Sequence, residues 1–122
     1  MVKEMTINPA WIKSYPGAIT VCDVDGIILE MNDRAIELFR DDGGEKLIGA
    51  NVLDCHPEPA RSQLAEMLRT QQQNIYTIEK RGAKKLIIQT PWYDNGKYAG
   101  FVELSLPIPF SIPHFIRTEK GG

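Results

Sequence analysis

The sequence predicts an α+β domain, a five-stranded antiparallel sheet with its helices packed on one face. Two short β-rich segments open the chain, and helical patterns occupy its middle. Three longer β-rich segments joined by tight turns then follow. Strands grouped in this way pair as hairpins, and the helices between the two groups are left to cover one face of the sheet.

Length and composition limit the class of protein. A chain of 122 residues is long enough for one hydrophobic core and too short for two. Its net charge of −2 disfavours nucleic acid and anionic membranes as partners, because both select basic surfaces. The sequence has no bilayer-spanning apolar run, no signal-peptide pattern and only two cysteines, so we expect a reduced, cytoplasmic protein.

The first expected elements are a short helix and a hairpin. Asn8 is a suitable N-cap with Pro9 at the first helical position, which gives a helical cap at residues 1–17. Residues 18–32 predict two strands around an Asp-Gly turn. Asn32 can then cap a helix that runs to about residue 40.

The second half contains a longer helix and a three-stranded meander. Two prolines, at 57 and 59, favour a helix start, and the helix should run to about residue 72. It carries an apolar stripe at Ala60, Leu64, Met67 and Leu68. The three strands are expected at 74–82, 83–94 and 97–108, joined by turns at Gly82 and Asn95-Gly96.

Three segments in order resemble the PAS family of sensory modules: "ITVCDVDGIILEMNDRAIELF", "LIGANVLD" and "WYDNGKYAGFVELSL", the last with its glycine at Gly100. The resemblance covers residues 15–106, so we assign 18–106 to a PAS-like domain. It implies a sheet that wraps a pocket behind short helices, non-enzymatic sensing, and signals passed through dimer contacts to a protein partner. The ligands of the family include haem, flavin and small acids, so the fold alone names none.

The chain departs from the family pattern in two places. Residues 107–122 form a Pro-rich tail in which Pro107, Pro109 and Pro113 exclude the continuous signalling helix that many PAS domains carry. A stand-alone or chain-terminal sensor is therefore expected, with Phe110, Ile112, Phe115 and Ile116 able to pack on the body or on a partner. The flavin-binding branch carries an Asn-Cys-Arg-Phe-Leu run, and "LDCHPEP" here disfavours flavin.

The last hairpin predicts two sheet faces. A two-residue turn at 95–96 pairs Tyr93 with Tyr98, and alternation extends the register outward. The face assigned to the pocket then holds Ile87, Gln89, Pro91, Tyr93, Tyr98, Gly100, Val102 and Leu104. The opposite face holds Leu86, Ile88, Thr90, Trp92, Ala99, Phe101, Glu103 and Ser105. Because Ile88, Trp92 and Phe101 are more apolar than solvent favours, we expect a homodimer through them.

Gln89 and the pair Cys55-His56 are the polar candidates. A buried amide at Gln89 needs a hydrogen-bond partner, which is either a backbone group or water, or a ligand. Adjacent residues point apart in extended chain, so His56 is poorly placed to activate Cys55, and no catalytic triad is recognisable. Zinc would need four spaced ligands, and the acidic "DDGGE" lacks calcium-loop spacing. Two readings remain: haem held by His56, or Cys55 packed as a small hydrophobe with His56 and Asp54 bonding helix amides.

The sequence therefore favours a non-enzymatic module that binds a small apolar or amphipathic ligand and signals through dimer or tail contacts, with no catalytic residue and no metal. The alternative is a haem- or thiol-based redox sensor centred on Cys55 and His56. The expected ligand-binding residues are His56, Cys55, Leu64, Met67, Leu68, Ile87, Gln89, Tyr93, Val102 and Leu104.

Overall fold

The structure is a computed structural model that describes residues 9–119. Its elements in chain order are α1 (Ala10–Lys13), β1 (Ala18–Cys22), β2 (Ile28–Met31), α2 (Asp33–Leu38), the 3₁₀ turns η2 (Arg40–Asp42), η3 (Gly44–Leu47) and η4 (Val52–Cys55), α3 (Ala60–Thr70), β3 (Asn74–Lys80), β4 (Ala83–Asp94) and β5 (Lys97–Ile108). The predicted α+β class is confirmed. The N-cap expected at Asn8 lies outside the described residues.

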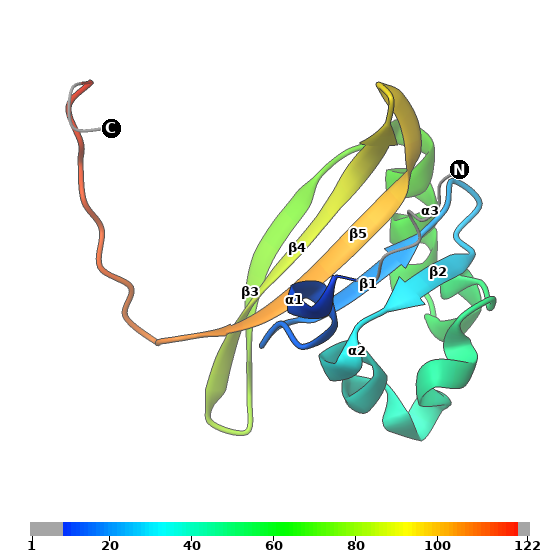
Figure 1. Cartoon of the computed structure of the whole chain (residues 1–122), viewed down its shortest axis with the longest axis horizontal. Coiled ribbons are helices and arrows are strands. Elements are labelled where there is room, and N and C mark those ends of the chain that lie inside the picture. The colour runs from blue at the N-terminus through cyan, green and yellow to red at the C-terminus, as the bar shows by residue number, and fades with distance from the viewer. Residues whose placement is uncertain (1–8, 120–122) are drawn as a thin grey trace.

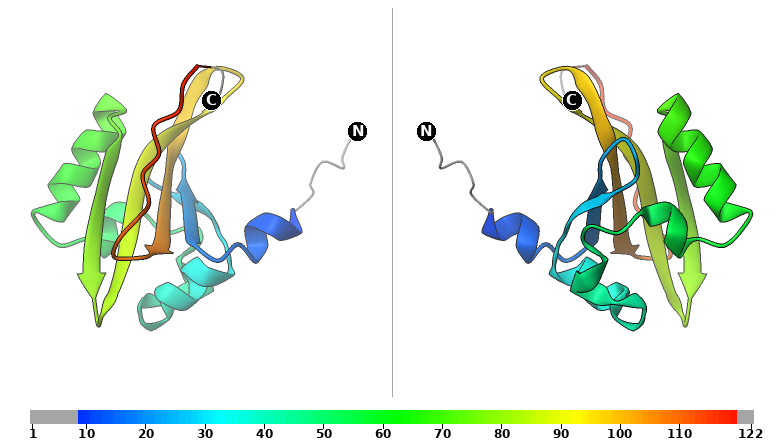
Figure 2. Two further views of the ribbon diagram at one scale, coloured as in Figure 1. Left: turned by 90° about the vertical axis from the view of Figure 1, so that its left-hand side faces the viewer. Right: turned by 90° about the vertical axis from the view of Figure 1, so that its right-hand side faces the viewer.

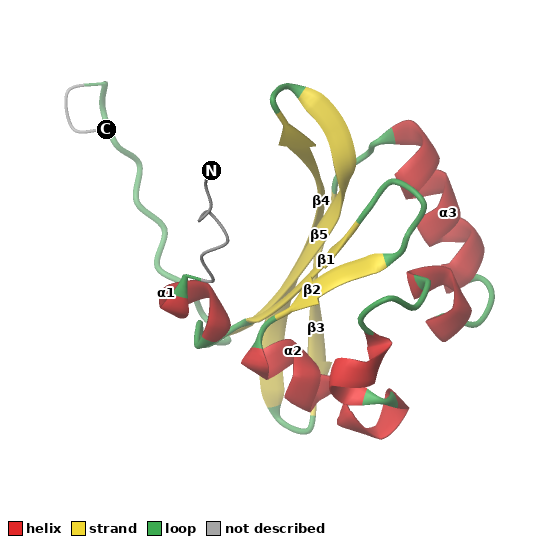
Figure 3. Ribbon diagram, turned by 45° about the vertical axis from the view of Figure 1, so that its right-hand side comes forward, coloured by secondary structure: helices red, strands yellow, loops and turns green. Residues whose placement is uncertain are grey.

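The five strands form one antiparallel sheet in the order β2-β1-β5-β4-β3 (Figure 1). Figure 3 shows α2, α3 and the 3₁₀ turns on one side of the sheet, and the chain after β5 leading away on the other side. We call the side toward α3 the inner face and the opposite side the outer face. The inner face carries two apolar clusters, one beneath α2 and one beneath α3.

Asn32 joins three elements at the N-terminal end of α2. Its side chain is 5% exposed, and Oδ1 accepts from the backbone N–H groups of Ile19 and Ala35, at 2.9 and 3.1 Å. Nδ2 donates to the carbonyls of Ile12 and Gly17, at 3.1 and 2.9 Å. The predicted N-cap of the helix at Asn32 is therefore confirmed, and the same side chain also ties α1 and β1 to α2.

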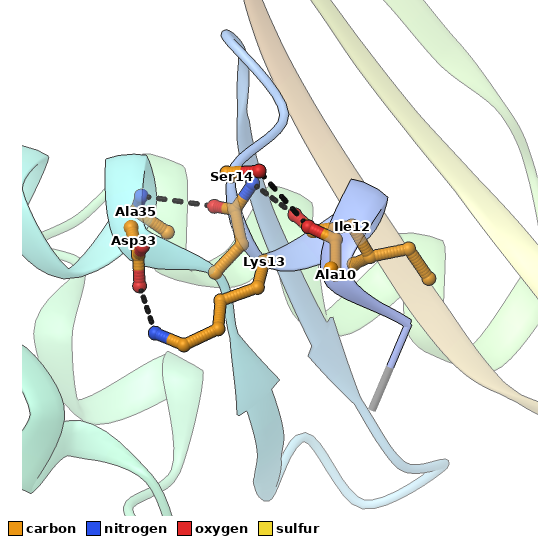
Figure 4. A network of polar contacts seen from close by, with 7 residues as sticks. Ala10, Ile12, Lys13, Ser14, Asp33 and Ala35 are labelled. Atoms are coloured by element: carbon orange, nitrogen blue, oxygen red, sulfur yellow. Dashed lines mark hydrogen bonds and ion pairs between the residues drawn. The ribbon is translucent and has the colours of Figure 1, made fainter. Parts of the chain in front are cut away.

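A surface ion pair lies beside this junction. Lys13 of α1 contacts Asp33, the first residue of α2, at 2.9 Å (Figure 4). Figure 4 also shows Ser14 turned toward Ala10, whose carbonyl accepts from the Ser14 hydroxyl at 2.9 Å. Both members of the ion pair are more than half exposed, so α1 is held mainly by the buried amide rather than by this charge pair.

The register predicted for the last hairpin is wrong beyond its first pairs. Tyr93 does pair with Tyr98, but Trp92 pairs with Gly100, so Ala99 is an extra residue in β5. Such a bulge shifts the remaining register by one, and a one-residue shift moves every side chain to the other face. The observed partners of Pro91, Gln89 and Ile87 are Phe101, Glu103 and Ser105.

The bulge exchanges the faces of β5. Phe101 is 4% exposed and packs with Cys22 and Leu68, so its expected place on the exposed sheet face is wrong. Glu103 and Ser105 share its inner face by alternation. Val102 and Leu104 instead pair with Thr90 and Ile88, on the outer face.

The chain leaves the sheet beyond β5. The strand continues through Pro107, at a position that β1 no longer reaches because its pairing ends at Ser105. Proline is tolerated where a strand has a neighbour on one side only. Residues 109–119 contain no helix, as predicted, and extend away from the body in Figure 1. The two views of Figure 2 look along this direction, so the tail is drawn across the sheet there. No helix among residues 9–119 is long and apolar enough to cross a membrane.

Candidate functional site

A cleft lies between α3 and the inner face of the sheet. Its deep part is a cavity of about 40 Å³ beside β1 and β5. A groove of about 350 Å³ continues from it between α3, β3 and β4. The two parts share four lining residues: His56, Leu64, Gln89 and Glu103. The deep part adds Thr20, Cys22, Val52, Phe101 and Val102, and the groove adds Ala60, Gln63, Met67, Asn74 and Tyr76.

A row of polar side chains crosses the floor of the cleft. Asn74, Gln89 and Glu103 lie opposite one another on three neighbouring strands. Asn74 Nδ2 donates to Gln89 Oε1 at 3.1 Å, and Gln89 Nε2 donates to Glu103 Oε2 at 2.9 Å. The partners of Gln89 are thus two side chains, an arrangement that only the bulged register of β5 allows.

His56 faces the cleft. The residue is half-buried and extended, with φ −117° and ψ 123°, as expected before a proline. Its Nδ1 lies 2.7 Å from the carbonyl oxygen of Val52. Since a carbonyl only accepts, Nδ1 carries the hydrogen, and in the neutral ring Nε2 is then an acceptor.

Cys55 lies outside the cleft. Its side chain is exposed, and Sγ is 3.9 Å from the carbonyl oxygen of Asn51. The expectation that Cys55 packs as a small hydrophobe is therefore wrong. The capping role expected of His56 and Asp54 is also wrong, because Glu58 accepts from the Ser62 N–H at the start of α3, while Asp54 pairs with Arg61 at 3.8 Å.

The other predicted binding residues divide into three groups. Leu64 and Met67 line the cleft from α3, and Val102 borders its deep part from β5. Leu68 and Ile87 are buried in the core, at 7% and 6% exposure. Tyr93 and Leu104 lie outside the cleft, because Tyr93 is 54% exposed near the hairpin tip and Leu104 is on the outer face.

The sequence did not predict several residues that line the cleft, chiefly Glu103, Thr20, Asn74 and Tyr76. Glu103 was placed on the wrong face by the unbulged register. A glycine inside a strand often marks a bulge, so Gly100 carried the signal that would have corrected it. Asn74 and Tyr76 follow from extending the corrected register to β3, where they face Gln89 and Ile87.

The electrostatics of the cleft are set by Glu103. Partial desolvation of the Tyr76 hydroxyl in the groove raises its pKa, although the residue as a whole is exposed, and the nearby Glu103 charge raises it further. Burial also raises the pKa of the Cys22 thiol, and the charges of Asp23 and Glu103 act in the same direction. Tyr76 and Cys22 therefore line the cleft in their neutral forms at pH 7, and the negative charge of the cleft comes from Glu103.

The residues do not fit a haem. His56 itself is suitable, because ligating histidines commonly donate their other ring N–H to a backbone carbonyl. The space beside it is not, since a cavity of about 40 Å³ holds only a few water molecules. The adjoining groove is floored by a carboxylate and two amides rather than by the apolar walls that surround a porphyrin. Among residues 9–119, no group of three or more His, Cys, Asp or Glu is placed to hold a metal ion.

The sheet order, the short central helices and the cleft on the inner face are those of a small α+β domain with a candidate ligand site beneath its helices. A family model described as the PAS fold matches residues 9–98. The chain therefore belongs to the PAS family, whose members are generally sensory modules rather than enzymes. A comparison with curated proteins found no match.

Solved structures show the same fold. A C-terminal domain from Streptococcus mutans has a TM-score of 0.65 and 21% identity, with 80% of each chain covered. The PAS domain of BvgS from Bordetella pertussis has a TM-score of 0.58 and 19% identity, with 82% of each chain covered. The Aer2 receptor of Vibrio cholerae, described as a dual PAS-haem oxygen sensor, has a TM-score of 0.55 and 20% identity, with 76% of this chain and 95% of that chain covered.

Proposed function

We propose that this PAS domain senses a small amphipathic molecule bound in the cleft between α3 and the inner sheet face. The observation that carries the proposal is the polar row on the sheet side of a cleft whose α3 side presents the apolar side chains of Leu64 and Met67. Leu64 and Met67 of α3 line it opposite Gln89 and Glu103 of the sheet. Binding sites for small molecules combine such apolar walls with a few placed polar groups, and 350 Å³ lies within their usual range.

The elements beside the groove are suited to respond to a ligand. Every residue of β3 is exposed, and α3 has one buried residue, Leu68. Elements with few buried contacts open at low free-energy cost, so they are the parts of a fold that a ligand can order. A ligand in the groove would contact α3 and β3 together and draw them into one packed unit.

The outer face would carry the signal to a second copy of the chain. It presents apolar, half-buried side chains on three adjacent strands: Ile19, Val21, Leu86, Ile88, Trp92, Val102, Leu104 and Leu106. Ile88 and Leu104 lie directly opposite each other at its centre. A continuous apolar face of this kind is unusual on a monomer, and a two-fold dimer would cover both copies of it. Trp92 and Ile88 remain in the proposed interface, and Val102 and Leu104 take the place of Phe101.

Native mass spectrometry of gently purified protein tests the binding site. The wild-type chain should carry a bound small molecule, and Leu64→Trp should lose it because the indole fills the groove. Ala65→Trp is the matched control, since residue 65 is exposed on α3 and lies outside the cleft lining. Equal retention by Leu64→Trp and the control, or a wild-type chain that carries nothing under any gentle condition, would contradict the proposal.

The haem alternative has a separate test. A visible absorption spectrum of the purified protein should show no haem band, because the cleft next to His56 does not accommodate a porphyrin. A strong haem band that disappears in His56→Ala would overturn this expectation.

A further inference from the structure

We propose that the cleft selects ligands that present a cationic hydrogen-bond donor, such as an amine or an amidinium, on a small apolar body. The inference rests on the proposed binding function and names the chemical class that the site would take. It follows from the groups that the cleft offers to a ligand, considered one by one.

Glu103 is an acid that forms no ion pair with a cation among residues 9–119. Its Oε2 accepts from Gln89 at 2.9 Å, and Oε1 has no donor among the described residues. None of the residues that line the two parts of the cleft is Lys or Arg. A half-buried carboxylate gains most from a charged donor that completes its hydrogen bonds, because the surroundings screen it less than bulk water does.

His56 provides a second acceptor in the same cleft. Because Nδ1–H is directed to the carbonyl of Val52, the neutral ring offers only the lone pair of Nε2 to a ligand. Glu103 and His56 both line the deep cavity and the groove. A ligand with several N–H groups on one end can satisfy both acceptors, whereas a ligand with only acceptors leaves them unpaired.

The apolar walls fix the rest of the ligand. Leu64 and Met67 lie on the helix side and Phe101 on the sheet side. These side chains suit one aromatic ring or a short aliphatic chain, and a groove of about 350 Å³ has room for a ligand of that size. An acidic ligand would bring its charge toward Glu103, which lines both parts of the cleft, and the two negative charges would repel each other.

Calorimetric titration of the full chain with three matched probes tests this selectivity. Benzamidine, benzyl alcohol and benzoate share a ring of the same size and differ in charge. At pH 7.5 and low salt, benzamidine should bind, benzyl alcohol should bind more weakly, and benzoate should not bind. Glu103→Gln keeps a hydrogen-bond partner for Gln89 and removes the charge. It should therefore lower the affinity for benzamidine by about tenfold or more and leave the affinity for benzyl alcohol unchanged.

Two controls separate the charge from the fold. Glu30→Gln removes an exposed carboxylate of β2, outside the cleft lining, and should leave benzamidine affinity unchanged. Added salt should lower the affinity of the wild type and of Glu30→Gln for benzamidine. It should have little effect on the affinity of Glu103→Gln. Matching thermal unfolding curves for the variants exclude a general loss of structure.

The outcomes distinguish this inference from the proposed function. Equal binding of benzamidine and benzyl alcohol, both abolished by Leu64→Trp, would retain the cleft as the binding site and refute the preference for cations. Binding of benzoate, or benzamidine affinity that is insensitive to Glu103→Gln, would refute it too. Failure of all three probes to bind the wild type also refutes it, whereas the proposed function is then judged by the native mass spectra alone.

Discussion

At the scale of single residues, the buried side chain of Asn32 holds together several segments of the described chain through its hydrogen bonds. Its amide forms four hydrogen bonds to backbone groups of Ile19, Ala35, Ile12 and Gly17. A buried amide with both its oxygen and its nitrogen satisfied stabilises a fold mainly because its removal leaves several backbone groups unpaired. Asn32 therefore matters for folding and lies apart from the ligand cleft.

Asn32→Ala tests this role. The variant should lower the free energy of unfolding by about 3 kcal/mol, because several buried donors and acceptors lose their partner at once. Urea unfolding followed by circular dichroism measures the change. Asp33→Ala is the control, since it removes only the exposed ion pair with Lys13 and should have little effect. Equal effects of the two substitutions would contradict the assignment.

The buried thiol of Cys22 should make the fold less stable at alkaline pH. Burial raises the pKa of its thiol in the folded state, whereas the unfolded thiol ionises near pH 8.5. Below that pH both states are protonated and the contribution is fully present. As the pH rises through 8.5, the unfolded state loses its proton first, so the free energy of unfolding falls.

The measurement compares urea unfolding between pH 7 and pH 9.5 in the presence of a reductant. Wild type and Cys55→Ala should lose stability in parallel above about pH 8.5, because Cys55 is exposed. Cys22→Ala should show a shallower decline, whatever its absolute stability. A decline as steep as that of the wild type would place the effect on another group.

At the scale of elements, the bulge in β5 determines which residues form the cleft. Gly100 has φ +142°, and a Cβ there would lie 1.9 Å from the carbonyl oxygen of Cys22. Trp92 Nε1 donates to the same oxygen at 3.0 Å. The close approach of β5 to β1 therefore requires glycine, and it directs Phe101 and Glu103 inward.

Gly100→Ala should destabilise the fold by about 3 kcal/mol or more, because the backbone conformation is strained for alanine and the new methyl group meets the β1 backbone. Gly82→Asn is the control. Residue 82 also has positive φ, at +79°, but a Cβ there meets nothing within 4 Å, and asparagine tolerates such backbone. Thermal unfolding of both variants should show a large loss for the first alone. Comparable small losses would show that β1 and β5 can separate at low cost.

The same bulge explains how far the sequence predicts this protein. Turn residues and alternation were sufficient for the bounds of β4 and β5, which match the expected 83–94 and 97–108. They were insufficient for the faces, because alternation carries no mark of the extra residue Ala99. His56, Leu64, Met67 and Gln89 were predicted as cleft residues because their positions do not depend on β5. Glu103 was not, because one residue of register separates the outer face from the inner face.

At the scale of the whole molecule, two apolar surfaces remain uncovered by the described chain. One is the outer face, centred on the Ile88–Leu104 pair. The other is the tail, where Phe115 and Ile116 are 70% and 91% exposed, so the tail does not fold back on the body. A long hydrogen bond, from Lys84 Nζ to the carbonyl of Phe110 at 3.4 Å, joins the start of the tail to the sheet.

The proposed dimer distinguishes these surfaces. Sedimentation equilibrium of the wild type should show a dimer in concentration-dependent exchange with monomer, and Ile88→Glu with Leu104→Glu should be monomeric because the charges would be buried without partners. Ile78→Glu is the control, since residue 78 is an apolar, 38% exposed side chain on the inner face of β3, and it should still dimerise.

Removal of the tail completes the test. A chain that ends at Ile108 loses the long, exposed hydrogen bond between Lys84 and Phe110, and its unfolding curve should match that of the full chain. Its dimer affinity should also be unchanged, because the outer face alone spans β1, β5 and β4. A truncated chain that is folded but monomeric would move the interface to the tail, and a wild-type chain that is monomeric at every concentration would exclude the dimer. Without a dimer, a signal to another protein would have to begin at the cleft side of the sheet, where α3 and β3 border the proposed ligand.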